Sequence, residues 1–407
     1  MKRSAFVAAA AAAGLHEPFR AVGESLPPAR IELGDEVFLS GTWRELGSRA
    51  VGIIANQSGV TSSLETVVDA AQRQTNLRIR AIFAPEHGFR GDVAAGASVA
   101  SYVDAQTHLP VHSLYGGTRR PTAEMLAGID VLLFDIQDVG SRAYTFVSTM
   151  AYAMQSAREF DKEIWVLDRP NPVGGEIVEG PVLQPAFESF IGLYPIPMRH
   201  GMTVGELARL FNDRFAINAR LRVVPMRGWQ RPMIWPDTRL QWVPTSPNVP
   251  TWETAFVYLC TGLIDNAGIN NGTGFTKPFF YAGAAGIDAQ RLALHLNERD
   301  LPGVWFRAAA WSPTSGFWQG RELRGVELVV FEPRRFLAVR TAVEILAAIR
   351  DLSPRALRID AAMLDRDWGT AMLREGLSNG SSGAKILASW SDAAARFGAL
   401  RQTYLLY

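Results

Sequence analysis

The chain has 407 residues, of which 48% are apolar and 20% charged, a composition typical of a soluble globular protein with enough length for two domains. Its net charge of +1 argues against a partner that needs a strongly basic surface, such as a nucleic acid or an anionic membrane. The single cysteine, Cys260, excludes an intrachain disulfide, and its apolar neighbours predict a small core residue rather than a nucleophile.

The N-terminus begins with Lys2 and Arg3, an alanine-rich apolar run and then a polar, proline-containing segment. This order is typical of a secretory signal. We therefore expect residues 1–30 to be a signal segment and linker, and the protein to be periplasmic or extracellular. The alternative is an alanine-rich helix on a cytoplasmic protein. No later stretch is long and apolar enough to span a bilayer, so stable membrane insertion is not expected.

From Arg49 onward the pattern alternates between strands and helices. Strands are predicted over 50–55, 77–84, 110–114, 129–134 and 164–167, with helices over 121–127 and 144–160 and a helix opened by a capping box of Ser62 and Glu65. Alternation of this kind indicates a mostly parallel sheet with right-handed crossovers, flanked by helices. The sequence thus predicts an α/β domain, which we place at 31–245.

The second half of the chain has a different pattern. Residues 179–194 look like a loop, Thr203 and Glu206 form a capping box that opens a helix, and 227–252 is rich in Trp and Pro without a steady period. Beyond it, strands over 304–309 and 326–331 and helices over 288–296 and 341–350 predict a smaller α+β domain at 246–407.

Polar side chains follow four successive strands of the predicted sheet. They are Asn56, then Glu86 with His87, then Asp135 with Asp138, and finally Asp168 with Arg169. The carboxyl ends of parallel strands share one edge, where open α/β sheets place their ligands. Each of these groups alone could be a solvated turn. All four together predict a functional site at this edge, arranged around Glu86.

The chain contains no phosphate-binding loop, nucleophile elbow or zinc signature, so no cofactor or metal is expected. Carboxylates remain as the reactive groups, including Glu179, and two carboxylates are enough to cleave a glycosidic bond. Arginines lie among them: Arg90, Arg142, Arg169 and Arg199. These either neutralise the carboxylates or bind an acidic group of the substrate.

Several long segments resemble the exo-β-N-acetylmuramidase family of bacterial peptidoglycan hydrolases. They are PEHGFRGD (85–92), LPVHSLYG (109–116), GIDVLLFDIQDVGSRAYTF (128–146), VLDRPNPVGG with VEGPVL (166–183), YPIPMRHGMTVGELA (194–208) and TSPNVPT (245–251). The resemblance runs from Arg49 to the end of the chain and is densest up to Thr276. It implies a Rossmann-like catalytic domain, a smaller domain that closes the cleft, and no nucleotide. The implied reaction releases N-acetylmuramic acid from the non-reducing end of a peptidoglycan-derived glycan or muropeptide.

The resemblance also implies roles for individual residues. Glu86 becomes the acid/base candidate beside His87, and Asp135 or Asp138 would stabilise the oxocarbenium-like centre or activate water, unless the acetamido group of the substrate takes that part. Arg90 or Arg142 would pair with the lactyl carboxylate. The full set of expected substrate-binding residues is Asn56, Arg90, Gln137, Arg142, Tyr144, Asp168, Arg169, Asn171, Glu179, His200, Asn248 and Asn271.

One loop departs from the family pattern. At 270–274 the chain reads Asn-Asn-Gly-Thr-Gly, so that Asn271 replaces a glutamate of the family and Thr273 an arginine. A second hypothesis follows from this difference, namely a non-catalytic muropeptide-binding or sugar-binding protein on the same scaffold. The oligomeric state is left open.

Overall fold

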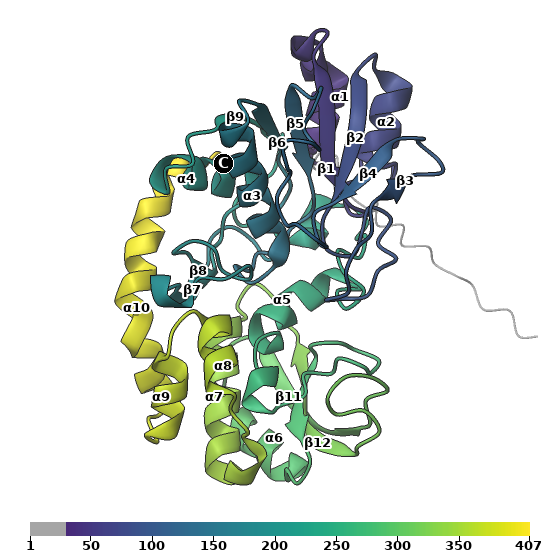
Figure 1. The fold of residues 1–407 in the computed structure, drawn as a ribbon. Helices are drawn as coiled ribbons and strands as arrows, with labels where there is room; N and C mark the ends of the chain where they lie inside the picture. Colours follow the sequence, from purple (N-terminus) through teal and green to yellow (C-terminus); the bar gives the residue numbers. More distant parts are fainter. Residues whose placement is uncertain (1–29) are drawn as a thin grey trace, which may run out of the picture.

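A computed structural model describes residues 30–407 (Figure 1). Its centre is a seven-stranded sheet in the order β3-β4-β2-β1-β5-β6-β9. The strands are β1 Ala50–Ala55, β2 Arg78–Ala84, β3 Tyr102–Val103, β4 Pro110–Ser113, β5 Val131–Asp135, β6 Glu163–Leu167 and β9 Arg220–Val224. Every neighbouring pair is parallel except β3 with β4, which confirms the predicted sheet. The predicted signal segment lies outside the described residues, apart from Arg30.

Helices cover both faces of this sheet. Helices α1 (Gly34–Ser40) and α2 (Val67–Gln74) pack on the face that carries Ile53 and Leu133, whereas α3 (Thr145–Glu159) and α4 (Val204–Arg214) pack on the opposite face with Ile54 and Phe134. Because the central strands are buried on both sides, their sequences are continuous apolar runs rather than alternating ones. The result is the three-layer, Rossmann-like arrangement that the sequence predicts.

The second domain contains a three-stranded antiparallel sheet in the order β10-β12-β11. Its elements are α5 Trp252–Thr261, β10 Tyr281–Ala284, α6 Ala289–Asn297, β11 Val304–Trp311, β12 Leu323–Val330, α7 Ala338–Leu352, α8 Ala361–Trp368 and α9 Met372–Ser378. Cys260 is buried in α5, as predicted. Among residues 30–407 no helix has both the length and the hydropathy needed to cross a membrane.

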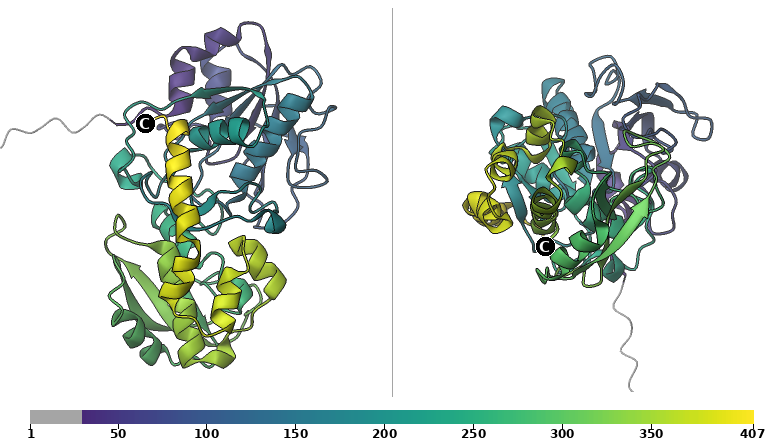
Figure 2. Two further views of the ribbon diagram at one scale, coloured as in Figure 1. Left: turned by 90° about the vertical axis from the view of Figure 1, so that its left-hand side faces the viewer. Right: turned by 90° about the horizontal axis from the view of Figure 1, so that it is seen from below.

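The last helix, α10 (Gly383–Leu400), runs along both domains and returns the chain to the first one (Figure 2). The guanidinium of Arg401 there donates to the carbonyl oxygens of Gly175 and His200, and the hydroxyl of Tyr407 donates to Asp168. The C-terminal end therefore packs against the sheet domain, a contact that the division at residue 245 does not anticipate.

A two-stranded sheet of β7 (Glu179–Val182) and β8 (Pro197–Arg199) lies between the domains. The carboxylate of Glu179 pairs with Arg199 and accepts the backbone N–H of Ala338, the first residue of α7. The predicted binding residue Glu179 thus ties the two domains together. Short 3-10 helices complete the chain at Thr42–Leu46, Pro185–Phe187, Trp235–Thr238, Asp265–Ala267, Pro354–Ala356 and Arg401–Tyr404.

Three local predictions are wrong. Helix α2 begins at Val67 with Thr66 as its cap, and not at a capping box of Ser62 and Glu65. Residues 121–127 form no helix, and the segment 123–128 consists of turns. The expected loop at 179–194 includes β7. The capping box of Thr203 and Glu206 is confirmed.

Candidate active site

Glu86 follows β2 directly after Pro85 and is half-buried. Its Oε2 accepts a hydrogen bond of 2.8 Å from the hydroxyl of Thr145, the first residue of α3. Its Oε1 accepts one of 3.0 Å from the backbone N–H of Gly96, in the loop that precedes β3. Donors from two separate segments therefore fix the orientation of this carboxyl group.

The Glu86 side chain opens into a cleft of about 430 Å³ between the two domains. The sheet domain contributes among others His87, Tyr115, Arg119, Tyr144 and Phe190, and the chain beyond residue 245 contributes Ser246, Asn248, Tyr258, Phe279 and Arg366. Among residues 30–407, Glu86 is the only carboxylate that lines the cleft. The cleft therefore lies where the resemblance places the site, and it presents one acid directly to a ligand.

His87 occupies an unusual backbone conformation beside the acid. Its φ of 73° lies in the left-handed region, which residues other than glycine seldom adopt. The buried ring is held by a contact of 3.0 Å between Nδ1 and the carbonyl oxygen of Val93. Backbone conformations of this kind concentrate at functional sites, where the surrounding structure enforces them.

Three tyrosine hydroxyls face the cleft or lie in its wall. Burial raises the pKa of Tyr144 and of Tyr258, and the charges of Glu86 and Asp138 add to this effect. Burial and the nearby Glu86 carboxylate raise the pKa of Tyr115. At neutral pH all three are therefore neutral hydroxyl groups that can donate hydrogen bonds, although the hydroxyl of Tyr144 already contacts Thr245 at 2.6 Å.

An aromatic group forms one side of the cleft. The ring of Phe190 stacks on Tyr152 at 5.8 Å between centroids and lies 6.1 Å from the ring of Tyr115. The guanidinium of Arg119 lies 4.1 Å from the centroid of Phe190 and 4.9 Å from that of Tyr115. This side of the cleft therefore offers apolar ring faces next to a positive charge.

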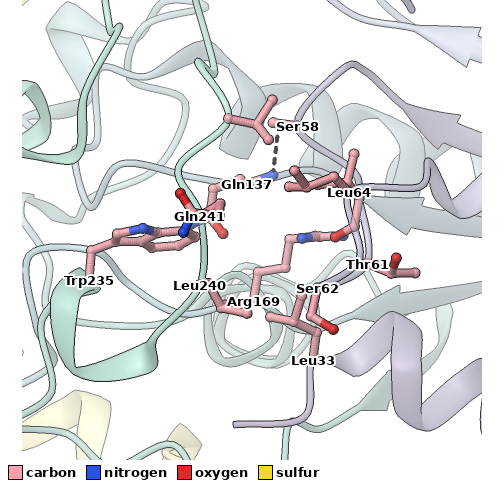
Figure 3. A pocket seen from close by; sticks show the side chains of 12 residues that line it. Leu33, Ser58, Thr61, Ser62, Leu64, Gln137, Arg169, Trp235, Leu240 and Gln241 are labelled. Atoms are coloured by element: carbon pink, nitrogen blue, oxygen red, sulfur yellow. Dashed lines mark hydrogen bonds between the residues drawn. The ribbon is translucent and has the colours of Figure 1, made fainter. Parts of the chain in front are cut away.

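Other predicted residues form a buried ion network instead of lining the cleft. Arg169 donates to Asp135 through Nε (2.6 Å) and to Asp35 through Nη2 (2.8 Å), and all three side chains are buried. Burial raises the pKa of Asp35 to about 8, against the opposing effect of Arg169. Above Arg169 lies a small pocket of about 20 Å³, room for about one water, with Trp235 and Gln137 at its edge (Figure 3). Asp135 and Arg169 are therefore already paired.

Asp138 and His200 lie behind the cleft wall. The Asp138 Oδ2 accepts the backbone N–H of Gly140 at 2.7 Å and lies 3.6 Å from Nε2 of His200. Both side chains are buried, and neither lines the cleft. Burial is the main cause of the raised pKa of Tyr144 and Tyr258, and Asp138 contributes a smaller part.

Four further predicted residues brace the loops at the carboxyl edge of the sheet. Asn56 accepts hydrogen bonds from the backbone N–H and the hydroxyl of Ser58, and Gln137 donates to the carbonyls of Asp138 and Pro170. Asp168 accepts hydrogen bonds from the hydroxyls of Thr203 and Tyr407. Asn171 donates to the carbonyl of Met202. The strand ends do converge, as predicted, but most of their polar groups are already hydrogen-bonded to neighbouring loops and helices.

The two arginines expected to meet a substrate carboxylate are placed elsewhere. Arg90 makes two hydrogen bonds to the carboxylate of Asp104. Arg142 is buried and donates to the backbone carbonyls of Pro181 and Asp367, which links the two domains. Neither guanidinium lines the cleft, and both are already occupied by these contacts.

Asn271, which replaces the family glutamate, is buried in its own loop. Its side chain donates to the carbonyl of Thr261 and accepts the backbone N–H of Thr273. It does not line the cleft. Asn271 therefore has a structural role in its own loop.

The sequence analysis missed several residues of the cleft, above all Arg119, Thr145, Tyr115 and Phe190. The sequence did contain a signal for Tyr115 and Arg119. Strand β4 lies next to β2, and Tyr115 and Arg119 follow its carboxyl end, so the strand-end argument also applies to them. Phe190 comes from a connecting segment that no pattern singled out.

Comparisons with known proteins agree with this architecture. A family model described as exo-beta-N-acetylmuramidase NamZ, N-terminal, matches residues 51–253, and the corresponding C-terminal model matches 256–407. The chain is 45% identical over 93% of its length, and 92% of the relative, to the peptidoglycan beta-N-acetylmuramidase NamZ of Bacillus subtilis strain 168. It is also similar to crystal structures of two DUF1343 family proteins from Bacteroides fragilis NCTC 9343. Their TM-scores are 0.87 and 0.77, with 37% and 26% identity, and each match covers 93% of this chain and 99% of the other.

Proposed function

This chain belongs to the exo-β-N-acetylmuramidase NamZ family, and we propose that the cleft around Glu86 is where it performs the family's reaction. The protein is a glycosidase that releases N-acetylmuramic acid from the non-reducing end of peptidoglycan fragments. The observation that carries the assignment of the site is the half-buried carboxyl group of Glu86, oriented by Thr145 and Gly96 and open to a cleft between the domains.

In the proposed mechanism, Glu86 donates its proton to the glycosidic oxygen as the bond from that oxygen to C1 of the sugar breaks. The positive charge that develops at C1 is then quenched by attack from the opposite face. Water finally supplies the hydroxyl at C1, and its second proton returns to the Glu86 carboxylate. Because Glu86 is the only carboxylate of the described chain that lines the cleft, the substrate's acetamido oxygen is the better candidate for the attacking group than Asp135, which is paired with Arg169.

The tyrosine hydroxyls and the aromatic group complete the site in this proposal. Neutral hydroxyls at Tyr115 and Tyr258 donate hydrogen bonds to sugar oxygens, and the ring of Phe190 packs against the apolar face of a pyranose. The non-catalytic alternative rested on Asn271, which lies outside the cleft lining, whereas the similar protein of Bacillus subtilis is named for its hydrolase activity.

We also propose that the protein is exported, although residues 1–29 lie outside the described part of the chain. Support comes from the order of Lys2, Arg3 and the alanine-rich run, and from the substrate, which is a component of the cell wall.

The test of the site compares the wild type with Glu86→Gln on a chromogenic N-acetylmuramide. Glutamine keeps the shape of the side chain but cannot give up a proton, so we expect turnover to fall about a hundredfold or more, with binding of the sugar preserved. The matched control is Glu298→Gln, an exposed glutamate of α6's C-terminal end that makes no contact with the cleft. Turnover near the wild-type value in Glu86→Gln would remove Glu86 from the acid/base role.

A further inference from the structure

Arg119 is an arginine of the cleft whose guanidinium is positioned by aromatic rings. It lies in the segment that follows β4, lines the cleft and is exposed. Its guanidinium lies over the rings of Phe190 and Tyr115, which restricts its orientation without using its N–H groups. An arginine held in this way loses little conformational freedom when it forms a bidentate pair with a carboxylate.

No acidic residue within 30–407 competes for this charge. The side chain of Arg119 makes no hydrogen bond and no ion pair with any of these residues, whereas its neighbour Arg120 pairs with Glu159. The arginines that the sequence suggested, Arg90 and Arg142, are occupied by a carboxylate and by backbone carbonyls, respectively.

The other cation of the cleft is less suited to the same part. Arg366 reaches the cleft from α8, but its Nε lies 3.9 Å from the carboxylate of Asp367, which offsets part of its charge. It also stacks on no aromatic ring among the described residues, so its position is less restricted. Arg119 is therefore the better candidate for reading a negative charge on the ligand.

Arg119 and Glu86 line the same cleft and lie on either side of Tyr115, an arrangement that fits the chemistry of the substrate. N-acetylmuramic acid carries its carboxylate on an ether at C3, two ring atoms from the C1 at which the glycosidic bond breaks. The carboxylate must therefore bind within one sugar ring of the catalytic acid. Tyr115 bridges this interval, because its hydroxyl lies near Glu86 and its ring lies beneath the guanidinium of Arg119.

We propose that Arg119 binds the lactyl carboxylate of N-acetylmuramic acid and so determines the preference of the cleft for muramic acid over sugars that lack this group. The proposal rests on the proposed function of the cleft. Arg119 binds the carboxylate in the ground state and in the transition state alike, so its contribution belongs to KM rather than to kcat.

The experiment measures KM and kcat for a chromogenic N-acetylmuramide and for its lactyl methyl ester, which lacks the charge and adds only a methyl group. The wild type should prefer the acid. In Arg119→Met we expect KM for the acid to rise about tenfold, the low end of the range for a charge-assisted pair because the site is partly exposed, while KM for the ester and both kcat values stay within about twofold. Arg119→Lys should recover part of the preference.

The matched control is Arg44→Met, because Arg44 also stacks on an aromatic ring, Trp43 at 5.0 Å, but lies near the amino end of the sheet, away from the cleft. If Arg119→Met keeps the wild-type preference for the acid over the ester, Arg119 does not read the carboxylate. If the wild type releases sugar from neither compound, the proposed function fails instead. Calorimetric binding of free N-acetylmuramic acid and its methyl ester to the wild type and Arg119→Met then decides the role of Arg119 without turnover.

Discussion

The hydrogen bond from Thr145 to Glu86 allows a test of how much the orientation of the acid contributes to turnover. The hydroxyl of Thr145 donates to Oε2 at 2.8 Å, and the residue is the first of α3. Thr145→Val removes this donor but keeps the branched shape of the side chain and a residue that tolerates the same backbone conformation. The substitution therefore changes one interaction of the acid and little else.

The expected fall in kcat of Thr145→Val follows from the geometry of this hydrogen bond. A hydrogen bond to a carboxylate contributes roughly 1.5–3 kcal/mol, which corresponds to a factor of about 10–150 if it is lost entirely in the transition state. Glu86 is only half-buried, and the N–H of Gly96 still holds its second oxygen, so water can replace part of what is lost. We therefore expect the lower end of the range, a fall in kcat of about tenfold with KM nearly unchanged.

Initial rates of release from the chromogenic N-acetylmuramide measure this effect, with circular dichroism melting as the check on the fold. Thr145→Ser keeps the hydroxyl and should retain most of the wild-type kcat, which separates the hydrogen bond from the packing of the methyl group. If Thr145→Val keeps kcat within twofold of the wild type while Glu86→Gln is inactive, the orientation of the acid does not depend on this donor.

Two further predictions concern the buried ion network at the carboxyl edge of the sheet. Arg169→Met leaves Asp135 buried without its partner and should lower the free energy of unfolding by about 3–5 kcal/mol in urea denaturation, whereas exposed Arg44→Met should change it by less than about 0.5 kcal/mol. Burial raises the pKa of Asp35 from 3.8 to about 8, so the folded chain keeps a proton that the unfolded chain releases above about pH 4. The free energy of unfolding should therefore fall as the pH rises from about 4 to about 8, and Asp35→Asn should show a shallower fall; equal slopes in the two proteins would refute this account.

The sheet domain could be predicted because its signal is local and repeated. Each central strand is a short apolar run that ends in polar residues, and parallel pairing makes the order of these strands consistent with right-handed crossovers. The path of α10 could not be predicted in this way. Its return to the first domain depends on contacts such as that of Arg401 with the carbonyl of Gly175, and the residues that form it lie far apart in the sequence.

For the site, the sequence identified the edge of the sheet but not which side chains face the ligand. Of the residues expected from the sequence, Glu86, His87, Tyr144 and Asn248 line the cleft, whereas Arg90 and Arg142 do not. A sequence pattern locates a charged residue at a strand end but does not show whether another charge already binds it. The partners that decide this, such as Asp104 for Arg90 and the carbonyl of Pro181 for Arg142, are set by tertiary packing.

The charged residues at the carboxyl edge of the sheet fall into two groups, those paired with one another inside the protein and those that face the cleft. Arg169 binds the acids Asp35 and Asp135, which come from different elements, and so holds the ends of neighbouring strands at fixed positions. A buried group of this kind can be stable only if its charges are balanced, and two acids with one arginine require one bound proton, which the raised pKa of Asp35 allows. Glu86 and Arg119 lie outside this network and keep their charge-bearing atoms open to the cleft. The carboxyl edge of the sheet thus combines a buried set of paired charges, which fixes the geometry, with two charges that face the cleft. Of these charged residues, only Glu86 and Arg119 should, when substituted, change KM or kcat while the free energy of unfolding stays the same.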